Sequence, residues 1–274
     1  MTLLCIDAGN TRGKWGLHTG HGLVNGVVNG VVNGVVNGVV NGAVDRWLAQ
    51  DIFDYAELGR DTLRTRWATA DRAVIANVAG AGVAQAIQHA LTGLGMPVLT
   101  VQARRSQCGV RNDYERPEQL GADRWAALIG ARRLHAGACL VVSVGTATTV
   151  DVLSERGVFL GGLILPGPQL MRSALSQRTA DLPFSQGRYT DLPRNTDDAI
   201  ASGCTHAQVG AIERMYASVR GRPGALCLLT GGGASEISAH LSIPYRPVPE
   251  LVLEGLAALG AATPASASSA GDQQ

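Results

Sequence analysis

Residues 3–17 read Leu3-Leu-Cys-Ile-Asp7-Ala-Gly9-Asn10-Thr11-Arg-Gly-Lys14-Trp-Gly-Leu17. An apolar run ending in an aspartate, a short polar turn and a second apolar run predict strand, tight turn and strand. Gly9 lets the backbone approach a ligand, and Asn10 and Thr11 offer N–H and hydroxyl groups to anionic oxygens. Asp7 is placed to hold a hydrated Mg²⁺, and Lys14 to reach a phosphate. The segment therefore predicts a phosphate-binding hairpin without a Walker A loop. The alternative is an ordinary hairpin whose polar side chains satisfy their own turn.

A similar segment recurs later as Leu140-Val-Val-Ser-Val-Gly145-Thr-Ala-Thr-Thr149-Val-Asp-Val-Leu153. The repetition predicts an internally duplicated α/β architecture, in which two polar turns facing across a cleft hold the phosphates of a nucleotide. A third turn, 231–233, consists of three glycines and follows the apolar run 226–230. Glycines let the backbone lie flat against a ligand, so we expect this turn to support the nucleoside.

Composition argues against several classes of partner. The 274-residue chain carries a net charge of +1 and only 4% aromatic residues, so neither a nucleic acid nor a membrane surface is an expected partner. No apolar run reaches the length of a membrane span, and we expect a cytoplasmic protein. The five cysteines are odd in number and include no C-x-x-C motif. They predict free, largely buried thiols rather than disulfides or a zinc site.

The rest of the chain supplies further elements and boundaries. Residues 23–44 repeat Asn-Gly with a period of four, which we interpret as an expanded surface loop; a functional repeat is the alternative. Strand, helix and strand are expected over 73–78, 79–95 and 96–101, a strand over 158–165, and helices over 117–135, 168–177, 196–218 and 254–262. The expected organisation is one domain over 1–115, a second over 116–263, and a disordered Ser/Ala/Gly-rich tail over 264–274.

Taken in order, these motifs resemble the type III pantothenate kinases of the acetate and sugar kinase, Hsp70 and actin superfamily. The likeness covers nearly the whole chain. It is carried by Asp7-Ala-Gly-Asn-Thr-Arg-Gly-Lys14, Tyr114, Gly121-Ala-Asp123-Arg124, Gly145-Thr-Ala-Thr-Thr-Val-Asp151, Gly161-Gly-Leu-Ile-Leu-Pro-Gly167, Thr179-Ala-Asp-Leu-Pro183, Asn195-Thr196, Ala199-Ile-Ala-Ser-Gly203, Thr230-Gly-Gly232 and Leu251-Val-Leu-Glu-Gly-Leu256. The resemblance implies two duplicated ribonuclease H-like α/β domains with an interdomain nucleotide cleft, the actin-like ATPase fold.

The resemblance also implies an activity, namely ATP-dependent phosphorylation of pantothenate to 4'-phosphopantothenate, the first step of coenzyme A synthesis. It implies a homodimer whose substrate pocket is completed by the partner subunit. Asp123 resembles the catalytic base, Arg124 a partner for the pantothenate carboxylate, and Thr179 the residue that reaches in from the other protomer. The pocket wall would comprise Tyr114, Gly121 and Ala122. ATP and its phosphates would be bound by Asp7, Ala8, Gly9, Asn10, Thr11, Arg12, Gly13, Lys14, Gly145, Thr146, Ala147, Thr148, Gly231 and Gly232, with Mg²⁺ held through water by Asp7.

Each of these residues also has a purely structural interpretation. Asp123 fits a helix N-cap, Arg124 a solvated ion pair, and Tyr114 a packing role at a rim. Thr148 and Thr149 fit simple β-strand preference. One position departs from the family pattern: Ser143 stands where many relatives carry an aspartate associated with a monovalent cation. A hydroxyl adds no charge, so a need for K⁺ or NH₄⁺ is in doubt.

Two other functions compete with pantothenate phosphorylation. One is a non-enzymatic accessory regulator of transcription, as some relatives are described, although Asp123 and both phosphate turns are retained. The other is a different small-molecule kinase on the same fold, because fold does not fix substrate.

Overall fold

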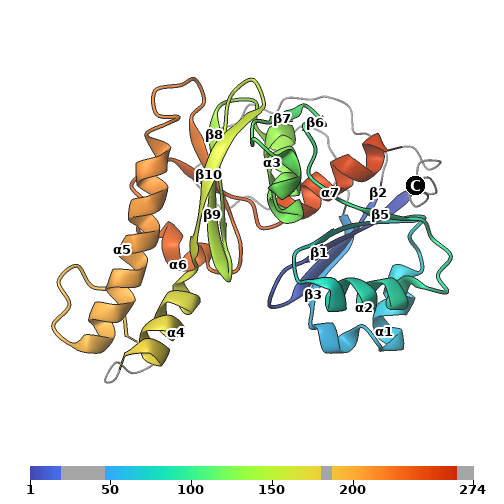
Figure 1. Ribbon diagram of the computed structural model, residues 1–274, viewed down its shortest axis with the longest axis horizontal. Helices are drawn as coiled ribbons and strands as arrows, with labels where there is room; N and C mark the ends of the chain where they lie inside the picture. The colour runs from blue at the N-terminus through green and yellow to red at the C-terminus, as the bar shows by residue number, and fades with distance from the viewer. Residues whose placement is uncertain (20–46, 180–186, 264–274) are drawn as a thin grey trace. The chain divides into compact units, whose positions relative to one another are not determined.

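The computed structural model describes residues 1–19, 47–179 and 187–263 (Figure 1). The Asn-Gly repeat and the C-terminal tail lie outside the described residues. The chain divides into two compact units, Met1–Ala136 together with Leu251–Gln274, and Gly137–Glu250. Each unit is built around its own β-sheet.

The first unit contains a mixed five-stranded sheet with the order β3-β2-β1-β4-β5. Neighbouring strands among β1, β2 and β3 are antiparallel, whereas β4 is parallel to both β1 and β5. The strands are β1 (Thr2–Ala8), β2 (Gly13–Thr19), β3 (Trp47–Phe53), β4 (Arg72–Asn77) and β5 (Val98–Thr100).

Helices cover both faces of this sheet. Leu4 and Ile6 pack into a core with the buried residues of α1 and α2, including Trp67. Leu3 points to the opposite face, where it lies against Gly260 of the last helix. Side chains alternate between faces along a strand, so β1 is buried on both sides and reads as a continuous apolar run. The helices of this unit are η1 (Tyr55–Glu57), α1 (Asp61–Trp67), α2 (Ala81–Leu91), η2 (Pro117–Gln119), α3 (Ala122–Leu134) and α7 (Leu251–Ala262).

The last helix, α7, returns to the first unit and packs against α3. The contact is so close that a Cβ on Gly255 would lie 1.8 Å from the carbonyl oxygen of Ala126, and one on Gly130 would lie 2.3 Å from that of Leu251. The structural division therefore differs from the boundary expected between residues 115 and 116. Residues 116–136 and α7 belong with the N-terminal sheet because the two helices pack on each other and α7 packs on β1 and β4.

In the second unit the strands follow the order β12-β11-β8-β9-β10. Strands β8, β9 and β10 are successively antiparallel, whereas β11 is parallel to both β8 and β12. The long helix α5 covers one face, where Ile212 and Tyr216 pack on Val142 and Val150. The elements are β8 (Cys139–Val144), β9 (Ala147–Leu153), β10 (Val158–Pro166), α4 (Pro168–Arg178), α5 (Thr196–Tyr216), β11 (Leu226–Thr230), α6 (Ala234–Ser238) and β12 (Tyr245–Pro247).

The two sheets share one topology, and this confirms the duplication predicted from the two similar hairpins. In each unit a three-stranded antiparallel meander is followed by two strands parallel to its first strand. A helix connects those two parallel strands in both units, α2 in the first and α6 in the second. The turn after β1 therefore corresponds to the turn after β8, and the turn after β4 to the turn after β11.

Several local predictions are confirmed and two are corrected. The expected helix over 117–135 is divided: η2 forms a single 3₁₀ turn, and α3 begins only at Ala122. The final helix starts at Leu251, three residues before the predicted start. All five cysteines are free, and four of them are buried. Among the described residues, no helix has both the length and the apolar character needed to cross a bilayer.

Candidate active site

The first predicted phosphate turn is the loop between β1 and β2. Asp7 lies opposite Lys14 in the strand register, and Gly13 begins the second strand. Asn10, Thr11 and Arg12 are exposed, whereas Ala8 is buried and Asp7 and Gly9 are partly buried. The turn thus presents polar groups outward with a carboxylate at its base, an arrangement suited to an anion and its metal ion.

Two aromatic residues, one at the end of β3 and one at the start of η1, hold this turn in place. The hydroxyl of Tyr55 donates a hydrogen bond to the carbonyl oxygen of Gly9. The ring of Phe53 fills the space beside Gly13, where an added Cβ would lie 2.2 Å from Cζ of Phe53. The sequence analysis missed both residues, because their role depends on the pairing of β3 with β2, which sets Phe53 opposite Gly13.

Asp7 has an unusual protonation equilibrium. Burial, the largest cause, and the negative charge of Asp123 together raise the pKa of its carboxyl from 3.8 to about 7, and the positive charge of Lys14 partly opposes this rise. Asp123 therefore acts electrostatically on the Asp7 carboxyl. Burial also raises the pKa of the Tyr55 hydroxyl to about 12, with a further contribution from Asp7. The site therefore concentrates negative charge that a divalent cation would relieve.

These two carboxylates are suited to magnesium carried by a nucleotide. Among the described residues, no group of three or more His, Cys, Asp or Glu side chains gathers to form a complete metal site. Mg²⁺ ordinarily keeps several waters and binds proteins through one or two carboxylates together with substrate phosphates. Asp7 and Asp123 meet that description: burial is the main cause that raises the pKa of each carboxyl, and the charge of Asp123 adds to the rise at Asp7.

Asp123 lies in the first turn of α3. The helix N-cap is Gly121, so the N-cap interpretation of Asp123 is wrong. Its Oδ1 accepts a hydrogen bond from the backbone N–H of Arg124 at 2.8 Å. Burial raises the pKa of Asp123, while this hydrogen bond and the Arg124 charge lower it. A side chain at Gly121 would displace the Asp123 carboxylate, because its Cβ would lie 2.6 Å from Oδ1.

Arg124 is buried beside the carboxylate rather than solvated. Only 6% of the residue is exposed, which rules out the solvated ion pair as its role. Its guanidinium carbon lies 5.8 Å from the centre of the Tyr114 ring, within the range of a cation–π contact. Tyr114 and Ala122 are partly buried. The structure therefore brings Tyr114, Arg124, Asp123 and Gly121 together in the first unit.

In the second unit, three glycine-bearing turns meet. The Gly145 N–H donates to the carbonyl of Ala147 at 3.0 Å, and the Gly167 N–H donates to the carbonyl of Thr146 at 2.9 Å. Gly231 has a φ of +95°, a conformation that favours glycine, and its Cβ would lie 2.3 Å from the Val144 carbonyl. The predicted phosphate turn and the predicted nucleoside turn are thus packed against each other.

The residues of the second turn, 145–148, differ in their exposure to solvent. Gly145 and Thr146 are exposed and Ala147 is partly buried, whereas Thr148 is fully buried. Within the described part of the chain, the Oγ1 of Thr148 has no hydrogen-bond partner. Because it is two residues from Val150 and four from Val152 along β9, it lies on the same strand face as these two valines, which pack toward α5. A contact from the Thr148 hydroxyl to an exposed phosphate would therefore require the β9 strand to rearrange.

Ser143 and Thr179 occupy other parts of the second unit. Ser143 is partly buried and pairs in register with Thr149 and Thr230, so its immediate strand neighbours carry neutral hydroxyls. Thr179 follows α4 as its C-cap residue, and its hydroxyl donates to the Leu175 carbonyl at 2.7 Å. It is exposed.

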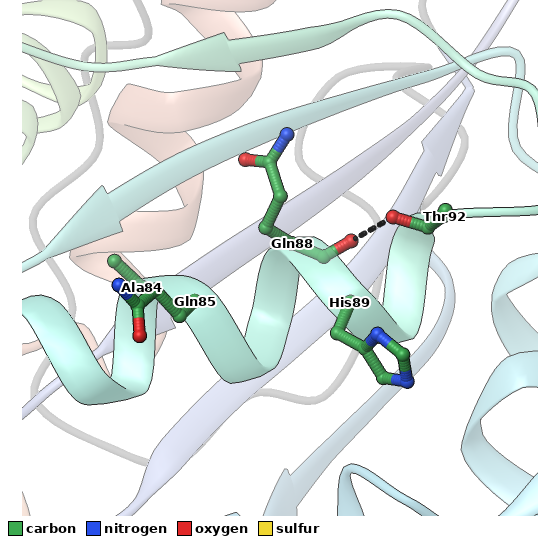
Figure 2. A pocket seen from close by; sticks show the side chains of 5 residues that line it. All are labelled: Ala84, Gln85, Gln88, His89 and Thr92. Atoms are coloured by element: carbon green, nitrogen blue, oxygen red, sulfur yellow. Dashed lines mark hydrogen bonds between the residues drawn. The ribbon is translucent and has the colours of Figure 1, made fainter.

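A shallow hollow lies elsewhere, on the exposed side of α2 (Figure 2). It is lined by Ala84, Gln85, Gln88, His89 and Thr92, all of them exposed. The Thr92 hydroxyl is already engaged, since it donates to the Gln88 carbonyl at 2.9 Å. The lining contains no carboxylate and no arginine or lysine, and phosphoryl transfer needs such groups. We therefore assign candidate functional residues to the polar turn of each unit and not to this hollow.

Comparison with solved structures gives the class of the protein. A chain from Campylobacter jejuni described as a Baf family transcriptional activator matches with a TM-score of 0.53 at 16% identity, covering 92% of this chain and 94% of that one. A Sinorhizobium meliloti chain described as a 2-dehydro-3-deoxygalactonokinase matches with a TM-score of 0.53 at 15% identity, covering 93% and 97%. At such low identity these matches establish the fold alone, and they confirm the predicted actin-like ATPase fold class.

Sequence comparison gives the family. The model of the type III pantothenate kinase family matches residues 3–218. A type III pantothenate kinase from Aromatoleum aromaticum is 49% identical over 256 residues, covering 93% of this chain and 96% of the relative. Another from Azoarcus sp. is 47% identical over 261 residues, covering 95% and 91%. The chain belongs to the type III pantothenate kinase family, and the resemblance drawn from its motifs is confirmed.

Proposed function

We propose that this protein transfers the γ-phosphoryl group of ATP to pantothenate, giving 4'-phosphopantothenate, the first step of coenzyme A synthesis. Membership of the family supports this assignment. The observation that carries it at the site is the presence in one unit of two largely buried carboxylates, Asp7 and Asp123, of which Asp123 acts electrostatically on Asp7 and lies next to the buried Arg124. A kinase needs a place for metal-bound phosphates next to a group that accepts a hydroxyl proton, and this pair offers both.

Asp123 serves as the catalytic base in this proposal. Its raised pKa makes the carboxylate a better proton acceptor than an exposed aspartate. The backbone N–H of Arg124 fixes the orientation of Oδ1. The substrate hydroxyl would lie against this carboxylate and lose its proton late, as phosphoryl transfer proceeds through a loose transition state.

Asp7 and the two polar turns bind the nucleotide. When bound, Mg²⁺ neutralises phosphate charge and helps to align the γ-phosphoryl group for in-line transfer. Asp7 would hold the hydrated ion, and Lys14, opposite it in the register, would contact a phosphate. The backbone groups of residues 8–13 and 145–147 would cradle the remaining phosphate oxygens, with Gly231 and Gly232 supporting the nucleoside. The buried hydroxyl of Thr148 is assigned a smaller part than the sequence suggested.

Arg124 would bind the pantothenate carboxylate, because a guanidinium can hold a carboxylate through two parallel hydrogen bonds and this one lies buried beside the Tyr114 ring. Tyr114, Gly121 and Ala122 form the wall of the same pocket. Thr179 would complete the pocket of the partner subunit in a homodimer. The apolar surface of the second unit supports such pairing, since Leu160, Leu163, Ile164 and Leu170 are 40–65% exposed. They lie on β10 and α4, the elements that lead to Thr179.

A coupled assay of ADP release tests the function directly. With ATP and Mg²⁺ present, we expect turnover to depend on pantothenate, and 4'-phosphopantothenate to be found by mass spectrometry. A sugar or a 2-dehydro-3-deoxy sugar acid in place of pantothenate is the matched control. Turnover with the sugar acid, or no turnover with any acceptor, would favour another small-molecule kinase or the accessory regulator.

The response to monovalent cations provides a further prediction. Ser143 and its strand neighbours Thr149 and Thr230 offer neutral oxygens, which hold K⁺ weakly. We expect the rate to rise only shallowly with K⁺ or NH₄⁺ at constant ionic strength, and Ser143→Asp to steepen the response. Ser143→Ala is the control. Saturable, many-fold activation of the wild-type protein would show that other oxygens, such as those of Asp151, supply a strong cation site.

A further inference from the structure

A short hairpin in the first unit precedes the loop 113–116, which carries Tyr114. Strands β6 (Ser106–Gln107) and β7 (Val110–Asn112) pair antiparallel, with Gln107 opposite Val110. Cys108 and Gly109 form the two-residue turn, with φ values of +49° and +77°. Two positive φ angles are the signature of a type I′ turn, which fixes the register of a hairpin. The same register sets Arg105 opposite Asn112, whose N–H donates to the Arg105 carbonyl at 2.9 Å.

Asn112 shapes the loop that follows this hairpin. The residue is fully buried. Its Oδ1 accepts a hydrogen bond from the backbone N–H of Tyr114 at 3.0 Å, and its Nδ2 donates to the Pro117 carbonyl at 3.1 Å. Replacing a buried amide whose two ends are hydrogen-bonded destabilises the fold, because the backbone groups that it paired are left buried without a hydrogen bond. Asn112 therefore fixes the chain on both sides of Tyr114.

The Arg105 guanidinium donates hydrogen bonds to three backbone carbonyls at this loop. Nη1 donates to the carbonyl of Asn112 at 2.9 Å and to that of Tyr114 at 3.0 Å, while Nη2 donates to that of Glu115 at 3.3 Å. A planar guanidinium can span several carbonyls in one fixed geometry, whereas a lysine ammonium is a compact point charge on a flexible stem. Tyr114 is thus held at its N–H by Asn112 and at its carbonyl by Arg105.

We propose that Arg105 and Asn112 are positioning residues that set the Tyr114 ring beside Arg124 and thereby determine affinity for the acidic acceptor substrate. The inference rests on the proposed function, in which Tyr114 and Arg124 form the pantothenate pocket. The Tyr114 ring lies 5.8 Å from the Arg124 guanidinium carbon, so a shift of the loop moves the ring relative to the group that binds the carboxylate. Neither positioning residue belongs to the nucleotide turns, so the effect should fall on one substrate only.

The test compares Arg105→Lys with Arg111→Lys. Arg111 is the matched control because it lies on the same hairpin and its ion pair with Asp113, at 3.0 Å, is largely exposed. We expect Arg105→Lys to lower kcat/KM for pantothenate by roughly tenfold to a hundredfold, the scale of a small misplacement of a substrate-contacting group. The KM for ATP and the melting temperature should stay near wild type. Arg111→Lys should leave all three quantities unchanged.

A double-mutant cycle separates positioning from general stability. If Arg105 acts through the Tyr114 ring, Arg105→Lys should have little further effect on KM for pantothenate when Tyr114 is already alanine. Independent effects of the two changes, equal rises in both KM values, or an unchanged KM for pantothenate would each overturn the inference while leaving an active kinase. A wild-type protein without pantothenate-dependent turnover would instead overturn the proposed function and the inference with it.

Discussion

Asp123→Asn is expected to lower kcat by roughly 10²–10⁴-fold, the usual contribution of a positioned general base. Asparagine keeps the size of the side chain and an oxygen able to accept the Arg124 N–H, so the fold and pantothenate affinity should survive. The measurement is steady-state ADP release at saturating ATP and pantothenate, with substrate affinity determined separately by calorimetry.

The matched control for this change is Asp113→Asn. Asp113 is an exposed aspartate in the same unit, paired with Arg111, and its loss should leave kcat near wild type. An Asp123→Asn enzyme that turns over at the wild-type rate would reduce Asp123 to a structural residue of the first turn of α3. Because Asp123 raises the pKa of Asp7, the substitution should also lower the pKa of Asp7.

Asp7→Asn is expected to remove the metal-dependent part of nucleotide binding and to lower kcat/KM for ATP by about 10²-fold or more, in line with the loss of one preorganised electrostatic group. The same change should alter the pH dependence of stability in the ligand-free protein. The pKa of Asp7 is about 7 in the folded chain, against an ordinary aspartate value of 3.8. Between these values the folded state holds a proton that the unfolded state has released.

The sign of the stability effect follows from that difference. A folded state that binds more protons loses stability as pH rises, so the contribution of Asp7 is fully present below about pH 4 and is lost on passing pH 7. The melting temperature of the wild type should therefore fall between pH 5 and pH 8. The fall should be larger in the wild type than in Asp7→Asn, and Mg²⁺ with ATP should make the wild-type fall smaller. The prediction fails if the variant and the wild type show the same change in melting temperature between the two pH values.

The hairpins of the polar turns could be predicted because their signals are local. Asp7 and Lys14 are seven residues apart in the sequence, and a strand-turn-strand pattern alone sets them opposite each other. The β6–β7 hairpin lacked such a signal. Its turn has Cys108 at a position with positive φ, where asparagine or aspartate is the usual residue. The same sequence pattern correctly predicted that the chain contains two versions of one hairpin.

Other features depend on contacts between distant segments. The threonine-rich run 146–149 predicted phosphate contacts, but strand alternation turns Thr148 into the core beside Val150. Tyr55 reaches Gly9 across 46 residues, and its role arises only when β3 pairs with β2. Arg105 supports Tyr114 through backbone carbonyls, which carry no sequence signal. Such residues are found from the folded chain and not from motifs.

The return of α7 to the first unit has a consequence for synthesis of the protein. Residues 137–250 form a continuous unit, so they can fold while the ribosome is still adding later residues. The N-terminal sheet is translated first, yet the face that carries Leu3 stays uncovered until Leu251–Ala262 emerge from the exit tunnel. The N-terminal sheet is therefore translated first but is the last to have both of its faces covered. Until then β1 exposes apolar side chains, and this strand is the segment on which chaperones would act longest.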